Sequence, residues 1–213
     1  MNHVVIKEFF IDRQVPYFQE YVKQYTSLPF LLKLDKQGEH YVPGRLVRAA
    51  DLSAHKGVEN DEWKLVEMDT EGKTRLPNGT LGFRWEEEHS GKWNLEQKDS
   101  QTGEEFDPLL TLLGAEDARA MTKFPDFTGT FSVDVGKSDP HALVGESVRE
   151  VPVKKLITDS GEEILVTTGF DLLCAHMGVP RGLAGEYPTD YDDATQTYTP
   201  AWQEQEPGIS REV

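Results

Sequence analysis

Residues 15–34, VPYFQEYVKQYTSLPFLLKL, decide the fold of the N-terminal part of this chain. In residues 15–25, Pro16 stands where the first turn of a helix tolerates a proline. The apolar side chains that follow have the i, i+3, i+4, i+7 spacing of one buried helix face. They are Phe18, Tyr21, Val22 and Tyr25. The spacing therefore predicts a helix over residues 15–25.

Residues 28–34, LPFLLKL, form a short and almost entirely apolar run. Its length and the preceding helix favour a strand that is buried on both faces, as in a parallel sheet. A helix followed by a buried strand is the unit of a doubly wound α/β domain. Upstream, residues 4–11 are also apolar, and a helix and a strand fit them equally well.

After Asp35 the chain changes to short β-forming runs separated by turn signals. The runs are residues 41–47, 62–68, 80–85 and 92–96, and the turn signals are Lys36-Gln37-Gly38, Glu71-Gly72, Asn78-Gly79 and Ser90-Gly91. Asn-Gly readily adopts the two positive φ angles of a type I′ turn, so Asn78-Gly79 predicts a hairpin tip. Residues 100–150 lack periodicity and predict long loops that lie on a larger body, with one short helix over residues 116–121.

Regular structure returns in the C-terminal part of the chain. Residues 151–158 and 163–168 flank Asp159-Ser160-Gly161 and predict a β-hairpin. Residues 170–177 predict a helix that ends at Gly178, and residues 187–199 are polar and irregular. Thr199 is expected to cap a helix that starts at Pro200, and residues 210–213 predict the start of a further helix.

These patterns predict a mixed α/β chain that forms a single incomplete domain. Residues 1–35 are expected to supply a helix and a buried strand of an α/β domain. Residues 36–150 are expected to form an insertion rich in β-hairpins and loops. Residues 151–213 are expected to return to the α/β body with a hairpin and helices.

The chain has 213 residues, and 38 acidic against 22 basic side chains give it a net charge of −16. Such a surface repels phosphate backbones and anionic membranes, so we expect no nucleic-acid partner and no membrane insertion. No apolar run approaches the ~18 residues of a transmembrane helix. The N-terminus MNHVVIKEFF lacks the features of a secretory signal, so we expect a cytoplasmic protein.

No metal-binding motif emerges from the histidines and the cysteine. The histidines show neither H-x-x-x-H nor H-E-x-x-H spacing; they are His3, His40, His55, His89, His141 and His176. Cys174 is the one cysteine, so this chain alone supplies neither an iron–sulfur cluster nor a Cys-rich zinc site, and we expect a buried structural side chain. Cys174 and His176 stand two positions apart and face different ways on a helix.

One acidic cluster, Asp190, Asp192 and Asp193, resembles a hard-cation site. A calcium-binding EF-hand loop would need glycine at its sixth position and glutamate at its twelfth, which are occupied by Thr195 and Ala201. The cluster is therefore interpreted as a solvated turn. The residues themselves assign no catalytic, cofactor-binding or metal-ligating position to this chain.

Seven segments resemble the alpha chain of the respiratory, membrane-bound nitrate reductases, in the molybdopterin oxidoreductase (DMSO reductase) superfamily. They are residues 12–34 (DRQVPYFQEYVKQYTSLPFLLKL), 41–52 (YVPGRLVRAADL), 77–85 (PNGTLGFRW), 91–105 (GKWNLEQKDSQTGEE), 152–156 (PVKKL), 166–183 (VTTGFDLLCAHMGVPRGL) and 191–205 (YDDATQTYTPAWQEQ). They occur in the order of the family and cover nearly the whole chain. Because that alpha chain is many times longer, the sequence resembles an internal fragment of it.

The resemblance implies an enzyme that reduces nitrate to nitrite at molybdenum held by a bis(molybdopterin guanine dinucleotide), with a 4Fe-4S cluster. It implies that quinol supplies electrons through an iron–sulfur beta subunit and a haem-containing membrane subunit, at the cytoplasmic face of the membrane. The ligands of the cluster and of molybdenum lie upstream in the family and have no counterpart here. We therefore expect this segment to be scaffold around the site, inactive alone, and to contact the remainder of the alpha chain.

Four residues are candidates for a pterin contact or a subunit interface: Arg45, Arg48, Arg84 and Trp85. For each, the alternative is a structural salt bridge or a core aromatic. A second function class is also open, in which the chain is a stand-alone, non-enzymatic binding or scaffold module. An incomplete domain is further expected to expose more apolar surface than a complete one and to self-associate.

Overall fold

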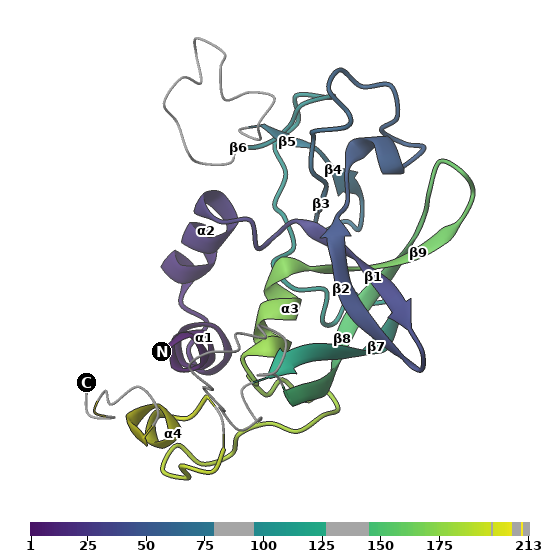
Figure 1. The fold of residues 1–213 in the computed structure, drawn as a ribbon. Helices are drawn as coiled ribbons and strands as arrows, with labels where there is room; N and C mark the ends of the chain where they lie inside the picture. The colour runs from purple at the N-terminus through teal and green to yellow at the C-terminus, as the bar shows by residue number, and fades with distance from the viewer. Residues whose placement is uncertain (79–95, 127–144, 197, 206–209, 211–213) are drawn as a thin grey trace, which may run out of the picture.

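A closed barrel organises the structure, a computed structural model that describes residues 1–78, 96–126, 145–196, 198–205 and 210. The barrel strands run in the order β1-β2-β7-β8-β9. Their bounds are β1 (Leu31–Gln37), β2 (His40–Leu46), β7 (Ala118–Asp126), β8 (Gly145–Ile157) and β9 (Glu163–Thr168). Figure 1 shows the barrel in the centre, with smaller strands at one end and helices at its side.

The barrel is almost entirely antiparallel. β1 pairs with β2 and with β9, and β8 pairs with β7 and with β9, all antiparallel. The closing contact between β2 and β7 is parallel and rests on the pair Tyr41 and Thr122. Two hairpin turns use glycines at positive φ, Gly38 (64°) between β1 and β2 and Gly161 (83°) between β8 and β9.

Two small sheets stand at one end of the barrel. One pairs β3 (Glu67–Met68) with β4 (Thr74–Arg75), and the other pairs β5 (Pro77–Asn78) with β6 (Glu96–Asp99). The helices are α1 (Asn2–Ile6), the π-helix η1 (Lys7–Asp12), α2 (Pro16–Tyr25), the 3-10 helix η2 (Ala49–Asp51), α3 (Gly169–His176) and α4 (Pro200–Gln205). None of the helices in the described part of the chain has the length and apolarity needed to cross a bilayer.

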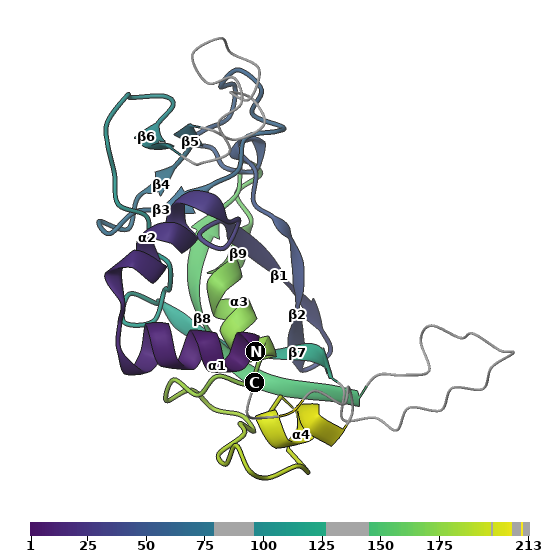
Figure 2. The ribbon, with the colours of Figure 1, turned by 90° about the vertical axis from the view of Figure 1, so that its left-hand side faces the viewer.

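Helix α3 lies between the barrel and the N-terminal helices (Figure 2). Leu172 and Ala175 on one side of α3 pack into the cluster of buried residues that β7 and β8 provide. Phe170 and Cys174 on the other side pack with Ile6 of α1 and with α2. This helix therefore joins two of the three hydrophobic clusters found among the described residues.

A buried carboxylate fixes the start of α3. Asp171 is fully buried, and its Oδ1 accepts hydrogen bonds from the Thr111 hydroxyl and from Arg181 Nη1, both at 2.5 Å. Its Oδ2 accepts from the Leu112 amide at 2.8 Å, and its own amide donates to the Thr168 hydroxyl at 3.0 Å. The cluster thus ties α3 to β9, to the loop at Thr111 and Leu112, which is about 60 residues away in the sequence, and to Arg181 just after the helix.

The mixed α/β class and several predicted elements are confirmed. The predicted helix over residues 15–25 is α2, and the run at 41–47 is β2. The hairpin around Asp159-Ser160-Gly161 is β8–β9, and Gly178 (φ 67°) follows α3 as predicted. Thr199 caps α4 through a 3.1 Å bond from the Trp202 amide, and residues 4–11 are helical.

The parallel sheet predicted for residues 28–34 is wrong. The strand is β1, and both of its neighbours are antiparallel. Leu31 and Leu34 are buried, whereas residues 35–37 at its end are exposed, so the strand is not buried on both faces throughout. The run is apolar because Leu34 packs into one buried cluster with β7 and β8, whereas Leu31 packs into another with Val47 and Val66.

Two further predictions are wrong. Residues 118–121 belong to strand β7 and residues 116–117 precede it, so the predicted helix is absent; Ala118 and Ala120 alternate with outward-facing side chains in a long ladder with β8. Within residues 100–150 the described strands cover residues 118–126 and 145–150, whereas residues 100–117 form no helix or strand, as the loop prediction expects. On α2, Val22 is buried as predicted but Tyr21 and Tyr25 are exposed.

Some predictions remain outside what the structure tests. The runs at 80–85 and most of 92–96, the turn at Ser90-Gly91 and the helix start at 210–213 lie outside the described residues, except for Glu96 and Ser210. Asn78 is a strand residue paired with Glu96, and the rest of its predicted turn is not described. Strands from all three predicted parts of the chain pair in one barrel, and the division at residues 35 and 150 stays a prediction.

We predict that Asp171→Asn lowers the free energy of unfolding by about 3–5 kcal/mol, because it leaves the Arg181 guanidinium buried without a counter-charge. Urea unfolding followed by circular dichroism measures this. The matched control is Glu163→Gln, which removes an exposed ion pair with Lys155 (3.0 Å) and should change stability by less than about 1 kcal/mol. Equal effects of the two variants would contradict the role of Asp171.

Candidate functional site

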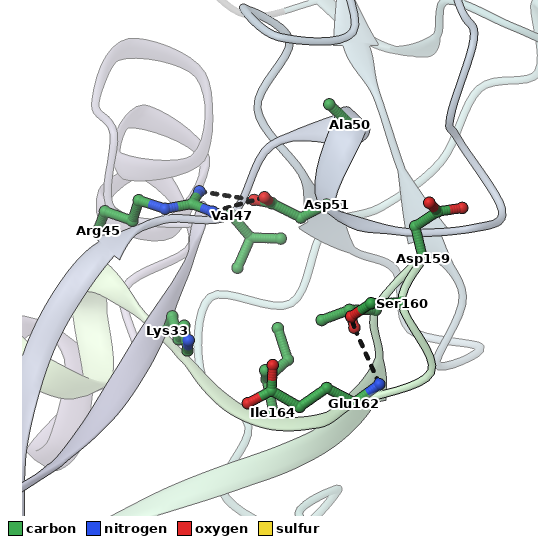
Figure 3. A pocket seen from close by; sticks show the side chains of 10 residues that line it. Lys33, Arg45, Val47, Ala50, Asp51, Asp159, Ser160, Glu162 and Ile164 are labelled. Atoms are coloured by element: carbon green, nitrogen blue, oxygen red, sulfur yellow. Dashed lines mark hydrogen bonds and ion pairs between the residues drawn. The ribbon is translucent and has the colours of Figure 1, made fainter.

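A polar cavity of about 310 Å³ opens beside the barrel, between the end of β2, helix η2 and the β8–β9 turn (Figure 3). Its lining contains both signs of charge. The lining residues are Lys33, Arg45, Val47, Ala50, Asp51, Thr158, Asp159, Ser160, Glu162 and Ile164. This cavity contains Arg45, one of the residues proposed from the sequence as a pterin or subunit contact.

The Arg45 guanidinium is already engaged within the chain. It donates to both carboxylate oxygens of Asp51, at 2.6 and 2.5 Å, a bidentate geometry that gives strong and directional pairing. These hydrogen bonds hold the pKa of Asp51 below its usual value. The backbone amide of Arg48 also donates to Asp51, at 2.8 Å, so this carboxylate fixes the start of η2.

The geometry therefore supports the structural salt bridge as the role of Arg45. Arg48 lies next to this pair: its backbone amide donates to Asp51, and the charge of its exposed side chain also contributes to lowering the pKa of Asp51. Arg84 and Trp85 lie outside the described residues. Of the other acidic side chains that line the cavity, Asp159 forms an ion pair with Lys56. The cavity presents mixed charge and no nucleophile paired with a base.

A second, apolar groove of about 590 Å³ lies between α3 and the edges of β2 and β7. Its lining is Leu28, Val42, Pro43, Lys123, Phe124, Pro125, Gly169, Leu172, Leu173 and His176. His176 stacks on Phe124 with ring centroids 5.7 Å apart, and its Nε2 donates to the Pro125 carbonyl at 3.0 Å. The imidazole therefore serves to hold α3 against β7.

Among the described residues, no group of three or more His, Cys, Asp or Glu side chains could hold a metal ion. Cys174 is buried, as predicted, and burial raises the pKa of its thiol to about 12. It faces the cluster with Phe170, whereas His176 faces Phe124, so the two do not meet.

The other described histidines have structural roles where their contacts are known. His3 Nδ1 lies 2.8 Å from the Met177 carbonyl, and burial lowers the pKa of this imidazole. His55 bridges Gln101 (2.6 Å) and Thr74 (2.8 Å). His89 and His141 lie outside the described residues.

The acidic cluster at residues 190–193 is a turn, as predicted. Asp190 Oδ1 accepts from the Asp192 amide, and Asp193 Oδ1 accepts from the Thr195 amide, both at 2.9 Å. Side chains that bond their own backbone two residues on are typical of Asx turns.

Sequence reasoning missed one unusual ionisable group. Glu67 is fully buried, and neither of its carboxyl oxygens has a hydrogen-bond partner among the described residues. Burial raises the pKa of Glu67 to about 8, and the nearby Lys23 ammonium opposes part of that rise. A single glutamate in a two-residue strand gives no sequence signal of burial, because such a residue ordinarily faces solvent.

Stability should therefore depend on the protonation of Glu67. In the unfolded chain this carboxyl ionises near its ordinary pKa of 4.5, whereas in the folded chain it keeps its proton to about pH 8. Between these values the unfolded state binds fewer protons, so the free energy of unfolding falls as pH rises, by at most ~1.4 kcal/mol per pH unit.

We predict that Glu67→Gln removes this fall and is more stable than the parent at pH 8 by a few kcal/mol. Urea unfolding between about pH 5 and pH 8 measures both slopes. Glu39→Gln, at an exposed turn position, is the control and should keep the parental slope. An unchanged slope in Glu67→Gln would refute the buried, protonated carboxyl.

We also predict that Cys174 does not react with Ellman's reagent in the folded chain and reacts fully in denaturant. The thiolate is the reactive species, and both burial and a pKa near 12 suppress it. Absorbance at 412 nm, read with and without ~6 M guanidinium, follows the reaction. Rapid stoichiometric labelling of the folded chain would contradict the prediction.

Comparison with known proteins finds relatives of this chain. No family model matches it. It is 44% identical over 213 residues to the respiratory nitrate reductase 1 alpha chain of Escherichia coli K12, covering 99% of this chain and 17% of that protein. It is 37% identical over 214 residues to the nitrate reductase alpha chain of Bacillus subtilis 168, covering 100% of this chain and 16% of that protein.

A similar match extends to the nitrate reductase alpha subunit of Mycobacterium tuberculosis H37Rv, with 41% identity over 212 residues, 98% of this chain and 16% of that protein. The chain thus spans about one-sixth of the length of these curated relatives. The resemblance seen in the sequence is confirmed: over nearly its whole length the chain matches a segment of the nitrate reductase alpha chains.

Proposed function

We propose that this chain is a scaffold segment of the catalytic alpha subunit of a molybdenum-dependent respiratory nitrate reductase. The observation that carries the proposal is the 44% identity that extends over 99% of this chain. The complete enzyme would reduce nitrate to nitrite with electrons from quinol, and a molybdenum bis(molybdopterin guanine dinucleotide) would carry the oxygen-atom transfer.

In this proposal the segment shapes the protein around the cofactor and supplies no ligand to it. The described residues do not fit a ligand set for molybdenum or for a 4Fe-4S cluster, since they form no group of metal-binding side chains and the Cys174 thiol is buried and protonated. Those ligands would come from the remainder of the alpha chain. Arg45, one of the two candidate cofactor contacts that the structure describes, is engaged with Asp51 instead.

The proposed partners follow from the same assignment. They are the remainder of the alpha chain, an iron–sulfur beta subunit and a haem-containing membrane subunit, with the complex at the cytoplasmic face of the membrane. The net charge of −16 supports a protein partner rather than nucleic acid.

One observation favours the second candidate, a stand-alone scaffold or binding module. A closed barrel has no open sheet edge, which removes one obstacle to independent folding. The neighbouring coding sequence distinguishes the two. A reading frame that continues upstream into an H-x-x-x-C-x-x-x-C-type motif supports the reductase segment, and a frame limited to this barrel supports the module.

We predict that the purified chain forms no nitrite with reduced viologen as electron donor and binds no molybdenum. The reason is that its described residues offer no metal-ligating group. Colorimetric nitrite detection and elemental analysis measure the two properties, and a complete nitrate reductase is the positive control. Stoichiometric molybdenum together with nitrite formation would disprove the scaffold assignment.

A further inference from the structure

Helix α2 carries an aromatic band that nothing in the described structure covers. Tyr17, Tyr21 and Tyr25 stand four residues apart and are 74%, 49% and 52% exposed. Their rings follow one another along the helix, with centroids 6.3 Å apart between Tyr17 and Tyr21 and 5.1 Å apart between Tyr21 and Tyr25. We call these three side chains the tyrosine band.

The opposite side of α2 anchors the helix to the molecule. Val22 is buried with Ile6 and Phe170, and Lys23 is paired with Asp107 at 2.5 Å. The helix is therefore fixed in place, and the tyrosine band points outward from a rigid support. In Figures 1 and 2, α2 lies at the periphery, on the far side of α3 from β2 and β7.

These three adjacent tyrosines, exposed by about half or more, form an apolar patch on the order of a few hundred Å²; the largest patch on a soluble monomer is of this size and is often functional. Tyrosine is enriched at protein interfaces, because its ring buries a large area at low entropy cost and its hydroxyl stays hydrogen-bonded at the rim. The chemistry fits a protein surface that is apolar in its centre and offers polar groups at its edge.

We propose that the tyrosine band is the docking surface for a part of the same, longer polypeptide that lies outside these 213 residues. This rests on the proposed function, in which the chain is a segment of an alpha subunit. The segment matches 16–17% of its relatives, so more than four-fifths of such a polypeptide is available to cover the band.

The net charge disfavours two other partners for the tyrosine band, a second copy of this chain and an anionic membrane. A second copy would also carry −16 and would be repelled. An anionic membrane attracts clusters of basic residues, whereas α2 contains one, Lys23, which is tied to Asp107. Within α2 the charges of Glu20 and Lys23 cancel, so the band is a neutral patch on an acidic molecule, suited to apolar contact within one chain.

The first test uses the 213-residue chain. Hydroxyl-radical labelling with mass spectrometry should modify all three tyrosines in every species that size-exclusion chromatography separates, monomeric or self-associated. Tyrosines that are protected in a species of dimeric mass would show a second copy on the band and overturn the proposal. This result is independent of whether any nitrate reductase assembles.

The second test replaces the matching segment of the Escherichia coli nitrate reductase 1 alpha chain by this chain. In the assembled complex the three tyrosines should be labelled about tenfold less than in the free chain, as expected inside a packed interface. An assembled complex with tyrosines labelled as in the free chain would overturn docking while leaving the proposed function intact. Failure of the chimera to assemble, with the native complex as control, would count against both.

Matched variants separate docking from folding. The triple variant Tyr17→Ser, Tyr21→Ser and Tyr25→Ser should leave the melting temperature of the free chain unchanged, because serine and tyrosine have similar helix propensities. In the chimera it should lower the yield of assembled complex, about tenfold, as hot-spot truncation does. The triple Tyr→Phe variant keeps the rings and should restore assembly. Equal yields from all three would contradict the proposal.

Discussion

The buried carboxylate of Asp171 is the interaction on which the rest of the structure depends. It lies in the first turn of α3 and accepts hydrogen bonds from two separate parts of the chain: the Thr111 hydroxyl and Leu112 amide, and the Arg181 guanidinium. Burying such a charge is unfavourable unless every lone pair is engaged. Because α3 joins the cluster of the barrel to the cluster of the N-terminal helices, the placement of this one helix determines how the two are packed.

The local parts of this fold could be predicted from the sequence, and the long-range parts could not. Pro16, Gly161, Gly178 and Thr199 mark starts, turns and caps through their own backbone preferences, and the structure confirms each. The direction of strand pairing at Leu31 depends on a partner strand more than 130 residues away, and a local apolar run does not indicate whether that partner is parallel or antiparallel. Residues 118–121 form a strand for the same reason, since the ladder with β8 outweighs local propensity.

The candidate site shows a similar division. A single cysteine and unsuitable histidine spacings indicate that this chain supplies few metal ligands, and Cys174 is buried as expected. Arg45 was recognisable as a candidate contact, but its engagement with Asp51 depends on the geometry of η2. The burial of Glu67 and the exposure of Tyr21 both depend on tertiary packing. For α2, helical periodicity identifies the aromatic residues that share a face, but it does not determine which face turns toward the core.

The structural role of this chain is distinct from the proposed reaction. The barrel, the Asp171 cluster and α3 form a rigid support, while the proposed reaction belongs to a cofactor held elsewhere in a longer polypeptide. A segment of this kind contributes by presenting fixed surfaces, such as the tyrosine band, rather than reactive groups. This requires that the N-terminal helices, α3 and the barrel unfold as one cooperative unit, since a loosely attached α2 could not present a defined surface.

Native-state hydrogen exchange tests that requirement most directly. The Leu112 amide donates to Asp171 and the Leu31 amide donates to the Val66 carbonyl, so they report on the α3 junction and on the barrel. We predict that both exchange only through global unfolding, with the same free energy and the same urea dependence. Exchange of Leu112 at a markedly lower free energy than Leu31 would show that the junction opens separately and would contradict the account.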